Sequence, residues 1–262
     1  MKVMILCGGQ GTRLRELTEL RPKPMVEIGG RPILWHIMKS FAHHGFKEFV
    51  LCLGYKAWTI KEYFLNYESM NSDFTIELGR NGIIELQGNA HQEDGWRITL
   101  CHTGENSMTG ARVKRASRYL GPGDEPFFLT YGDGVANVDI RALLKFHLAH
   151  GKAATVTGVR PPSRFGTLES VDNKVLNFKE KPQSGQGLVN GGFFALERGF
   201  LKYLTEDEGC ILERSPLERC AQEGQLHLYE HGGFWQCMDT YRDWQALEDM
   251  WQKGEAPWKV WP

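Results

Sequence analysis

The sequence predicts an α/β protein with a Rossmann-like, open, mixed and mostly parallel sheet, flanked by helices and interrupted by an antiparallel β meander. Three observations lead to this fold class. The chain begins with an apolar run that ends in a glycine-rich loop. Apolar runs then alternate with helical patterns through the first half. Between residues 73 and 102 the pattern changes to short strands separated by polar, glycine-containing turns.

The first half of the chain has a strand–helix–strand–helix order. Lys2–Leu6 is an apolar run bounded by glycine, which is typical of a buried strand in a parallel sheet. Pro32–Phe46 carries apolar residues at helical spacing, and Gly45 is its stop signal. Glu48–Leu53 is the second predicted strand and Ala57–Tyr67 the second predicted helix.

The middle of the chain begins with the insertion. Residues 73–102 contain the segments DFTIEL, IIELQ and WRITLCH, which predict an antiparallel meander. The α/β order then resumes with a helix near Gly110–Leu120 and a strand in PFFLTYGDG. A helix at Val138–His150 and a strand at Ala153–Val159 follow.

The last third is less regular. It contains a predicted hairpin at Gly166–Phe178, a strand at Leu188–Leu196 and helices near Pro216–Glu223 and Tyr241–Trp251. The sequence contains no internal repeat, linker or low-complexity tract. It therefore predicts a single domain over residues 1–262, with residues 73–102 as a β insertion.

The glycine-rich segment GGQGTR follows the first predicted strand directly. Gly8, Gly9 and Gly11 leave backbone N–H groups uncovered and tolerate positive φ, so several donors can point at one phosphate. Thr12 adds a hydroxyl group and Arg13 a permanent positive charge. In open α/β sheets such a loop lies at the ligand-binding edge. A mere tight turn is the alternative interpretation of the glycines.

Two familiar phosphate loops are excluded by spacing. No segment matches the Walker A pattern, and Leu14 stands where a dinucleotide fingerprint requires its third glycine. Ten residues after Arg13, Lys23 lies between Pro22 and Pro24, which stiffen the backbone on both sides of it. This arrangement predicts that Lys23 is a charged clamp beside the loop.

Two aspartates are candidate metal ligands. Asp133 lies in YGDG at the end of an apolar strand, and Asp239 lies in QCMDT just before the last helix. Mg²⁺ bound to nucleotide phosphates takes one or two protein carboxylates, so two such residues suffice. A hairpin turn at Asp133 and a helix cap at Asp239 are the alternatives.

Lys181 and Asn190 are candidates of another kind. Lys181 lies before a proline after a predicted strand, and Asn190 lies beside two glycines, where an amide next to bare backbone suits sugar hydroxyls. A solvated lysine and an ordinary turn asparagine are the usual cases for these residue types.

Composition restricts the class of protein. The chain has 262 residues, of which 41% are apolar, and a net charge of −1. This balance argues against a nucleic-acid partner, which needs an excess of clustered basic residues. The sequence shows neither a signal-peptide pattern nor an apolar run of membrane-spanning length, so we expect a cytoplasmic protein without a membrane partner. Its six cysteines form no C-x-x-C pair, so we expect reduced thiols.

The motifs GGQGTRL with PKPM, YGDG, EKP, NGGFF and MDT occur in that order over the whole chain. Together they resemble the sugar-1-phosphate nucleotidylyltransferases. The segments VEIGGRPILWHIMK, SMTGARVKR, RFGTLE and FWQCMDT are similar to the members of that family that use CTP. The resemblance implies transfer of CMP from CTP to glucose 1-phosphate, giving CDP-glucose and pyrophosphate, with Mg²⁺ as cofactor.

The resemblance also implies roles for individual residues. Arg13, Lys23, Asp133 and Lys181 would be catalytic, and Asp133 and Asp239 would bind Mg²⁺. The nucleotide would contact Leu6, Cys7, Gly8, Gly9, Gln10, Gly11, Thr12, Arg13, Lys23, Ser107, Arg112 and Gly132. The sugar phosphate would contact Glu180, Lys181, Asn190 and Gly191.

Base selection is expected to involve Arg112. Cytosine presents acceptors at O2 and N3, whereas uracil presents a donor at N3, so a donor-only side chain favours cytosine. The alternative is a solvated basic helix face shared with Lys114 and Arg115.

Two positions depart from the family pattern. Cys7 replaces the usual alanine, which should matter little, and Ser215 stands where the pattern has glutamate, which puts any contact by that carboxylate in doubt. The insertion at residues 73–102 and the tail APWKVWP are expected to form lid or oligomer contacts, because Trp258 and Trp261 would otherwise be an exposed apolar patch. We therefore expect a homo-oligomer.

Three other functions remain open. The closest is a uridylyl-, thymidylyl- or guanylyltransferase of the same fold. A dinucleotide-dependent oxidoreductase is disfavoured by Leu14 and by the basic residues around the loop. A sugar-nucleotide sensor without activity is disfavoured by the presence of Asp133, Asp239 and Lys181 together.

Overall fold

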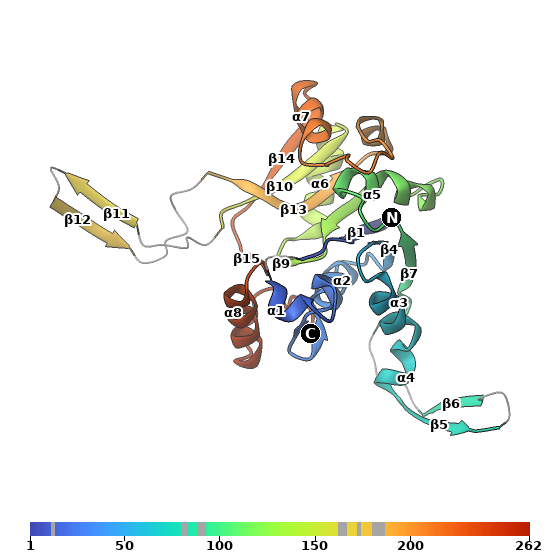
Figure 1. The fold of residues 1–262 in the computed structure, drawn as a ribbon. Coiled ribbons are helices and arrows are strands. Elements are labelled where there is room, and N and C mark those ends of the chain that lie inside the picture. The colour runs from blue at the N-terminus through green and yellow to red at the C-terminus, as the bar shows by residue number, and fades with distance from the viewer. Residues whose placement is uncertain (12–13, 80–82, 88–92, 162–166, 172–173, 180–186) are drawn as a thin grey trace.

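A seven-stranded sheet forms the centre of the computed structural model (Figure 1). The structure describes residues 1–11, 14–79, 83–87, 93–161, 167–171, 174–179 and 187–262. The strand order is β14-β10-β13-β8-β1-β4-β7. The strands are β1 (Lys2–Cys7), β4 (Glu48–Leu53), β7 (Arg97–His102), β8 (Phe127–Tyr131), β10 (Ala154–Val159), β13 (Val189–Leu196) and β14 (Leu226–His231).

The direction of the strands confirms the predicted fold class. Strands β14, β10, β8, β1, β4 and β7 run parallel, and β13 is antiparallel to both of its neighbours. The parallel strands therefore end at one edge of the sheet, and β13 begins there. Chain order reverses between β1 and β8, which makes this point the topological switch where open α/β sheets bind ligands.

Helices cover both faces of the sheet. They are α1 (Arg15–Thr18), α2 (Ile33–His43), α3 (Ala57–Leu65), α4 (Tyr67–Asn71), α5 (Thr109–Ala116), α6 (Ile140–His150), α7 (Ser215–Gln222) and α8 (Tyr241–Gln252). Short 3₁₀ helices occur at Lys23–Met25, Ser117–Tyr119 and Arg198–Tyr203. No helix among the described residues is both long and apolar enough to cross a membrane.

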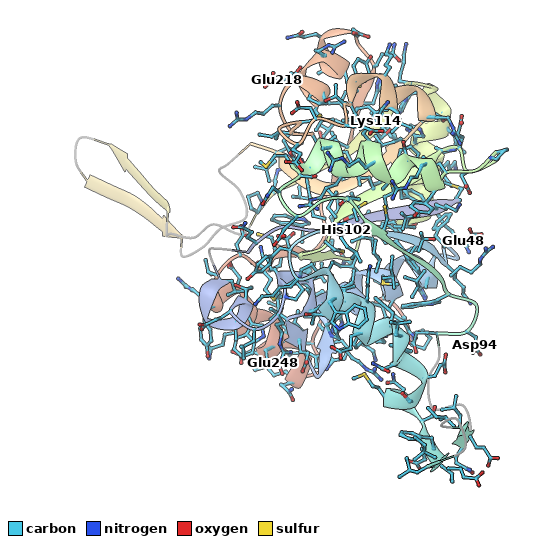
Figure 2. The ribbon with its side chains drawn as sticks, turned by 45° about the vertical axis from the view of Figure 1, so that its right-hand side comes forward. Glu48, Asp94, His102, Lys114, Glu218 and Glu248 are labelled. Carbon is cyan, nitrogen blue, oxygen red and sulfur yellow. The ribbon has the colours of Figure 1, made fainter. Side chains whose placement is uncertain are left out.

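Two cores follow from the alternation of side chains along β1. Val3 and Ile5 belong to a core with α2, α8 and the C-terminal tail, whereas Met4 and Leu6 belong to a second core with α5 and α7. Figure 2 shows the same division, with Lys114 on α5 and Glu218 on α7 lying on one side of the sheet and Glu248 on α8 on the other.

Four short antiparallel pairs complete the described structure. They are β2 (Glu27–Ile28) with β3 (Arg31–Pro32), β5 (Asp73–Glu77) with β6 (Ile83–Gln87), β9 (Gly134–Ala136) with β15 (Trp235–Cys237), and β11 (Thr167–Val171) with β12 (Lys174–Lys179). The β5–β6 pair extends away from the sheet beyond α4 (Figure 1).

The predicted meander is wrong in its third segment. Strands β5 and β6 form an antiparallel hairpin, but β7 leaves it and pairs in parallel with β4, from Glu48↔Arg97 to Leu53↔His102. The reason is long-range: β7 pairs with the backbone edge of β4, and Trp96 packs its ring against Phe49. The helices are also shorter than predicted, since Ala57–Tyr67 is divided at Asn66 and α5 ends at Ala116.

The C-terminal tail packs into the core, whereas the sequence suggested that it forms lid or oligomer contacts at the surface. Trp258 and Trp261 are not exposed: they are 1% and 7% accessible and belong to the core of the same chain. Both rings pack around His36 on α2. The Nε2 atom of His36 lies 2.8 Å from the carbonyl oxygen of Ile28, and Trp258 donates its Nε1–H to Nδ1 at 3.4 Å. The tail therefore closes the core of its own subunit.

Stability should fall as the solution becomes acidic. Burial lowers the pKa of both His36 and His147 to about 4, so each is neutral in the folded protein down to that pH. The unfolded chain takes up protons near pH 6.5, so it binds more protons than the folded chain between pH 6.5 and 4, and stability is lost across that window. We expect a loss of roughly 3 kcal/mol per histidine by pH 4.

Urea denaturation at pH 7.5, 6, 5 and 4.5 measures this loss. A His147→Phe variant should lose less stability on acidification than the native protein, because it lacks one of the two buried neutral histidines. A free energy of unfolding that is flat from pH 7 to 4.5 would contradict the burial of neutral histidines.

Candidate functional site

A cleft of about 390 Å³ lies where the loops after β1 and β8 meet. It is lined by Leu6, Cys7, Gly8, Gly9, Gln10, Gly11, Lys23, Pro24, Ser107, Met108, Thr109, Arg112, Tyr131, Gly132 and Asp133. The structure thus brings together most of the residues expected at the nucleotide. Thr12 and Arg13 lie outside the described residues.

Two glycines at the cleft, Gly11 and Gly132, are required for different structural reasons. Gly11 has φ of +63° and accepts a hydrogen bond from the backbone N–H of Leu14, so the chain turns there in a conformation that favours glycine. A β-carbon at Gly132 would lie 2.7 Å from the carbonyl oxygen of Leu6, so glycine allows the end of β8 to approach β1. Glycine at position 11 therefore permits a turn, and glycine at position 132 permits close backbone approach between β8 and β1.

Arg112 lines the nucleotide cleft, as expected, and its guanidinium is also held by the surrounding loops. Its side chain is 4% exposed and lies between two glycines: a β-carbon at Gly8 or Gly54 would be 2.2 Å from its guanidinium. Nη2 donates to the carbonyl oxygens of Gly8 and Glu105, and Nη1 donates to those of Leu53 and Gly104 and to Thr103 Oγ1.

These contacts join the loops that follow β1, β4 and β7. The N–H groups on both Nη atoms of Arg112 point at protein acceptors, so they face the loops rather than a base. The alternative of a solvated basic helix face fails too, because Arg112 is buried. Its geometry is that of a residue that holds the nucleotide loop in position.

Ser107 and Cys7 also contribute structure to the cleft wall. The Ser107 hydroxyl donates to the carbonyl of Thr103 at 2.8 Å and accepts from Arg115 at 2.7 Å. Cys7 is 1% exposed, and burial raises the pKa of its thiol, so it stays protonated. The replacement of alanine by this small side chain fits the packing.

Lys23, Asp133 and Asp239 converge at one end of the cleft. The Nζ atom of Lys23 lies 2.6 Å from Asp133 Oδ2 and 2.6 Å from Asp239 Oδ1. Asp133 follows β8, and Asp239 follows β15, whose neighbour Met238 donates its N–H to the Asp133 carbonyl. Burial acts to lower the pKa of Lys23, but the two carboxylates outweigh it and raise that pKa.

The alternative roles of the two aspartates can now be judged. The cap of α8 is a box formed by Thr240 and Asp243, so the Asp239 side chain is not the cap. Gly132 and Asp133 connect β8 to β9, and these two strands pair with other partners rather than with each other, so Asp133 is not in a hairpin turn.

The carboxylates suit a magnesium ion in number and kind. Two oxygens from different loops converge within reach of one ammonium group, and Mg²⁺ at nucleotide phosphates needs one or two such ligands. Among the described parts of the chain, no group of three or more His, Cys, Asp or Glu side chains could hold a metal. This excludes a closed all-protein cage there, but it leaves a site completed by phosphates and water.

A second cleft of about 240 Å³ adjoins the first and shares Tyr131 and Asp133 with it. Its other lining residues are Thr130, Gly134, Gly191, Trp235, Cys237 and Asp239. Gly191 is confined, because a β-carbon there would lie 3.0 Å from the carbonyl oxygen of Thr157. Asn190 lies at the start of β13, next to this cleft, and Glu180 and Lys181 lie outside the described residues.

Sequence reasoning missed several residues that line this second cleft or contact its lining residues. Trp235 donates its Nε1–H to the Gly191 carbonyl at 2.8 Å, and Tyr131 contacts both Asn190 and Glu213. Tyr131 directly precedes the GDG motif. This position, two residues before a candidate metal ligand, is the sequence signal that could have identified it. No sequence signal pointed to Glu213, because its partner Tyr131 lies 82 positions away in the chain. Ser215, by contrast, is exposed at the first turn of α7.

Known proteins resemble this chain in sequence and in fold. Residues 2–236 match the family model described as nucleotidyl transferase. The chain is 49% identical to the glucose-1-phosphate cytidylyltransferases of Salmonella typhi and of Salmonella typhimurium strain LT2, over 100% of both chains in each case. A crystal structure of HddC from Yersinia pseudotuberculosis has the same fold, with a TM-score of 0.67 at 22% identity, covering 95% of this chain and 99% of that chain.

Proposed function

The chain belongs to the nucleotidyl transferase family, and from that premise we propose that it transfers CMP from CTP to glucose 1-phosphate, releasing pyrophosphate and forming CDP-glucose. Two observations support the proposal. The relatives that are 49% identical over the full length carry this activity in their name. The cleft that holds the glycine loop meets a second cleft at Asp133, as a reaction between two phosphorylated substrates requires.

The reaction needs little covalent chemistry from the protein. The phosphate of a sugar phosphate is already an anionic nucleophile at neutral pH, so neither a general base nor a covalent intermediate is required. The obstacle is repulsion between this anion and the triphosphate. Catalysis therefore depends on positioning and on neutralising charge.

The residues at the junction of the two clefts supply both positioning and charge neutralisation. The loop N–H groups bind phosphate oxygens, and Lys23 brings a buried positive charge to the boundary between the clefts. Asp133 and Asp239 would hold Mg²⁺, which when bound supplies charge neutralisation between the two substrates. Arg13 would draw charge onto the leaving pyrophosphate, and Lys181 with Glu180, Asn190 and Gly191 would bind the sugar phosphate.

The single observation that carries the assignment of the site is the convergence of Lys23, Asp133 and Asp239, at 2.6 Å, beside a glycine-rich loop. A sensor protein would need the binding loop but not this cluster. The choice of CTP rests on the relatives, since the donors of both Arg112 Nη atoms face the loops.

Pyrophosphate release with glucose 1-phosphate and, in turn, CTP, UTP, dTTP and GTP tests the proposal. We expect turnover with CTP and little with the others. Faster turnover with UTP, dTTP or GTP would assign the chain to a different branch of the family. No release with any of the four nucleotides would remove the proposed activity altogether.

We also propose that the chain self-associates through the β5–β6 hairpin. Phe74 pairs with Leu86 and Ile76 with Ile84, so all four side chains lie on one face, and each is between 45% and 52% exposed. A two-stranded hairpin with a bare apolar face is marginal in water. A second copy of the same face is self-complementary and would cover it.

The hairpin proposal predicts the effect of a charge. Ile76→Lys should lower the mass measured by light scattering after gel filtration, because it places an ammonium group in the interface. Thr75→Lys, on the opposite face of the same strand, should leave the mass unchanged. A native protein that is monomeric at every concentration, or an Ile76→Lys protein of unchanged mass, would contradict the proposal.

The compartment is proposed from the cysteines. All six are free thiols, and four of them are buried. Free thiols suit a reducing compartment, and we place the enzyme in the cytoplasm on this ground.

A further inference from the structure

Tyr131 lies between the two clefts and contributes to both of them. Its ring rests on the backbone of Gly192, where a β-carbon would lie 2.4 Å from the ring atom Cδ2, and φ at Gly192 is +80°. Any other residue at position 192 would push the ring away. The NGG sequence of β13 therefore fixes the position of the Tyr131 ring at the junction of the two clefts.

A chain of hydrogen bonds ends at the hydroxyl of Tyr131. This hydroxyl donates to Glu213 Oε1 at 2.5 Å, and Thr109 donates from Oγ1 to Glu213 Oε2 at 2.6 Å. The Thr109 hydroxyl in turn accepts from the backbone N–H of Leu212 at 2.9 Å. An ionised carboxylate can only accept, so the direction of each proton is set. Thr109 also lines the nucleotide cleft, so the chain spans both halves of the site.

The Tyr131 hydroxyl and the backbone N–H of Gly192 together fix the orientation of the Asn190 amide. Once the hydroxyl has donated to Glu213, its oxygen can only accept, and Asn190 donates to it from Nδ2 at 3.1 Å. The Oδ1 atom of Asn190 then accepts from the backbone N–H of Gly192 at 2.9 Å. Among the described residues, these contacts leave one N–H and one lone pair of the amide, which is one donor and one acceptor for sugar hydroxyls.

We propose that Glu213 and Tyr131 are positioning residues that hold the Asn190 amide in one orientation and thereby select the hydroxyl stereochemistry of the sugar phosphate. The inference rests on the proposed function, because it concerns the acceptor substrate of that same site. A flipped amide would exchange donor and acceptor and would match a sugar whose hydroxyls are arranged differently.

The test compares Tyr131→Phe and Glu213→Gln with the native enzyme in the pyrophosphate assay. We expect KM for glucose 1-phosphate to rise by about tenfold in each variant, as for the loss of one oriented hydrogen bond, while KM for CTP stays within about twofold. The preference for glucose 1-phosphate over galactose 1-phosphate and mannose 1-phosphate should narrow. Glu218→Gln, an exposed glutamate on nearby α7, is the matched control and should change none of these values.

The double variant separates positioning from mere stability. Residues that act as one chain are not additive, so Tyr131→Phe with Glu213→Gln should be no worse for the sugar phosphate than Tyr131→Phe alone. Equal rises in KM for both substrates, or additive losses with unchanged sugar preference, would overturn the inference. Native turnover in the same assay tests the proposed function separately, since it does not depend on either variant.

Discussion

Asp239→Ala and Asp133→Ala should each lower kcat by about a thousandfold, which corresponds to the loss of several kcal/mol of transition-state stabilisation. The two carboxylates are the ligands that we propose for Mg²⁺, and each lies 2.6 Å from Lys23 at the boundary of the two clefts. Removing either would leave one protein ligand and an incompletely balanced Lys23. The measurement is pyrophosphate release at saturating CTP and glucose 1-phosphate, with circular dichroism to show that the fold is intact.

Asp249→Asn is the matched control for this prediction. Asp249 is an exposed aspartate on α8, ten residues from Asp239, so its replacement should leave kcat close to native. If Asp239→Ala turned over normally and still required Mg²⁺, the metal ligand would have to be sought elsewhere.

A binding measurement gives the same site a readout that does not involve activity. Lys23 places a positive charge between the two carboxylates and competes with a metal for their oxygens. Lys23→Met should therefore bind Mn²⁺ more tightly than the native protein when no nucleotide is present, as followed by electron paramagnetic resonance. Asp239→Ala should bind it more weakly. Equal Mn²⁺ affinity in all three proteins would show that these residues do not form the metal site.

Arg112→Ala should lower the free energy of unfolding by about 3 kcal/mol or more, because it leaves several acceptors in three loops without a donor. The nucleotide loop would lose its link to β4 and β7. We therefore expect the KM values for CTP and UTP to rise by similar factors, with no change in the ratio of the two. Urea denaturation and parallel assays with both nucleotides measure these effects.

Lys114→Ala on the same helix is the control. Its ammonium group makes one hydrogen bond to the Leu201 carbonyl, on the side away from the loops, so its loss should cost less than about 1 kcal/mol. An Arg112→Ala protein of native stability that discriminates less between CTP and UTP would restore the base-reading role expected from the sequence.

Local patterns in the sequence determined much of the fold. Glu48–Leu53 has the predicted bounds of β4, and Ala153–Val159 differs from β10 by one residue, because apolar runs between turn signals depend on neighbouring residues alone. The glycine loop and the prolines around Lys23 were likewise visible, since positive φ and fixed φ are properties of single residue types. The motif order also indicated the family, because it extends over the whole chain.

The tertiary structure decided what depends on partners far away in the chain. Lys23 meets Asp133 and Asp239 across 110 and 216 positions, and no pattern in a single sequence reveals such a pairing. Strand β7 joined the sheet rather than its neighbouring hairpin, because pairing with the edge of β4 outweighs a local meander signal. The tail tryptophans were expected at the surface but fill the core around His36. An arginine offers the same donors to a base or to a buried carbonyl, and burial between Gly8 and Gly54 directed those of Arg112 to the loops.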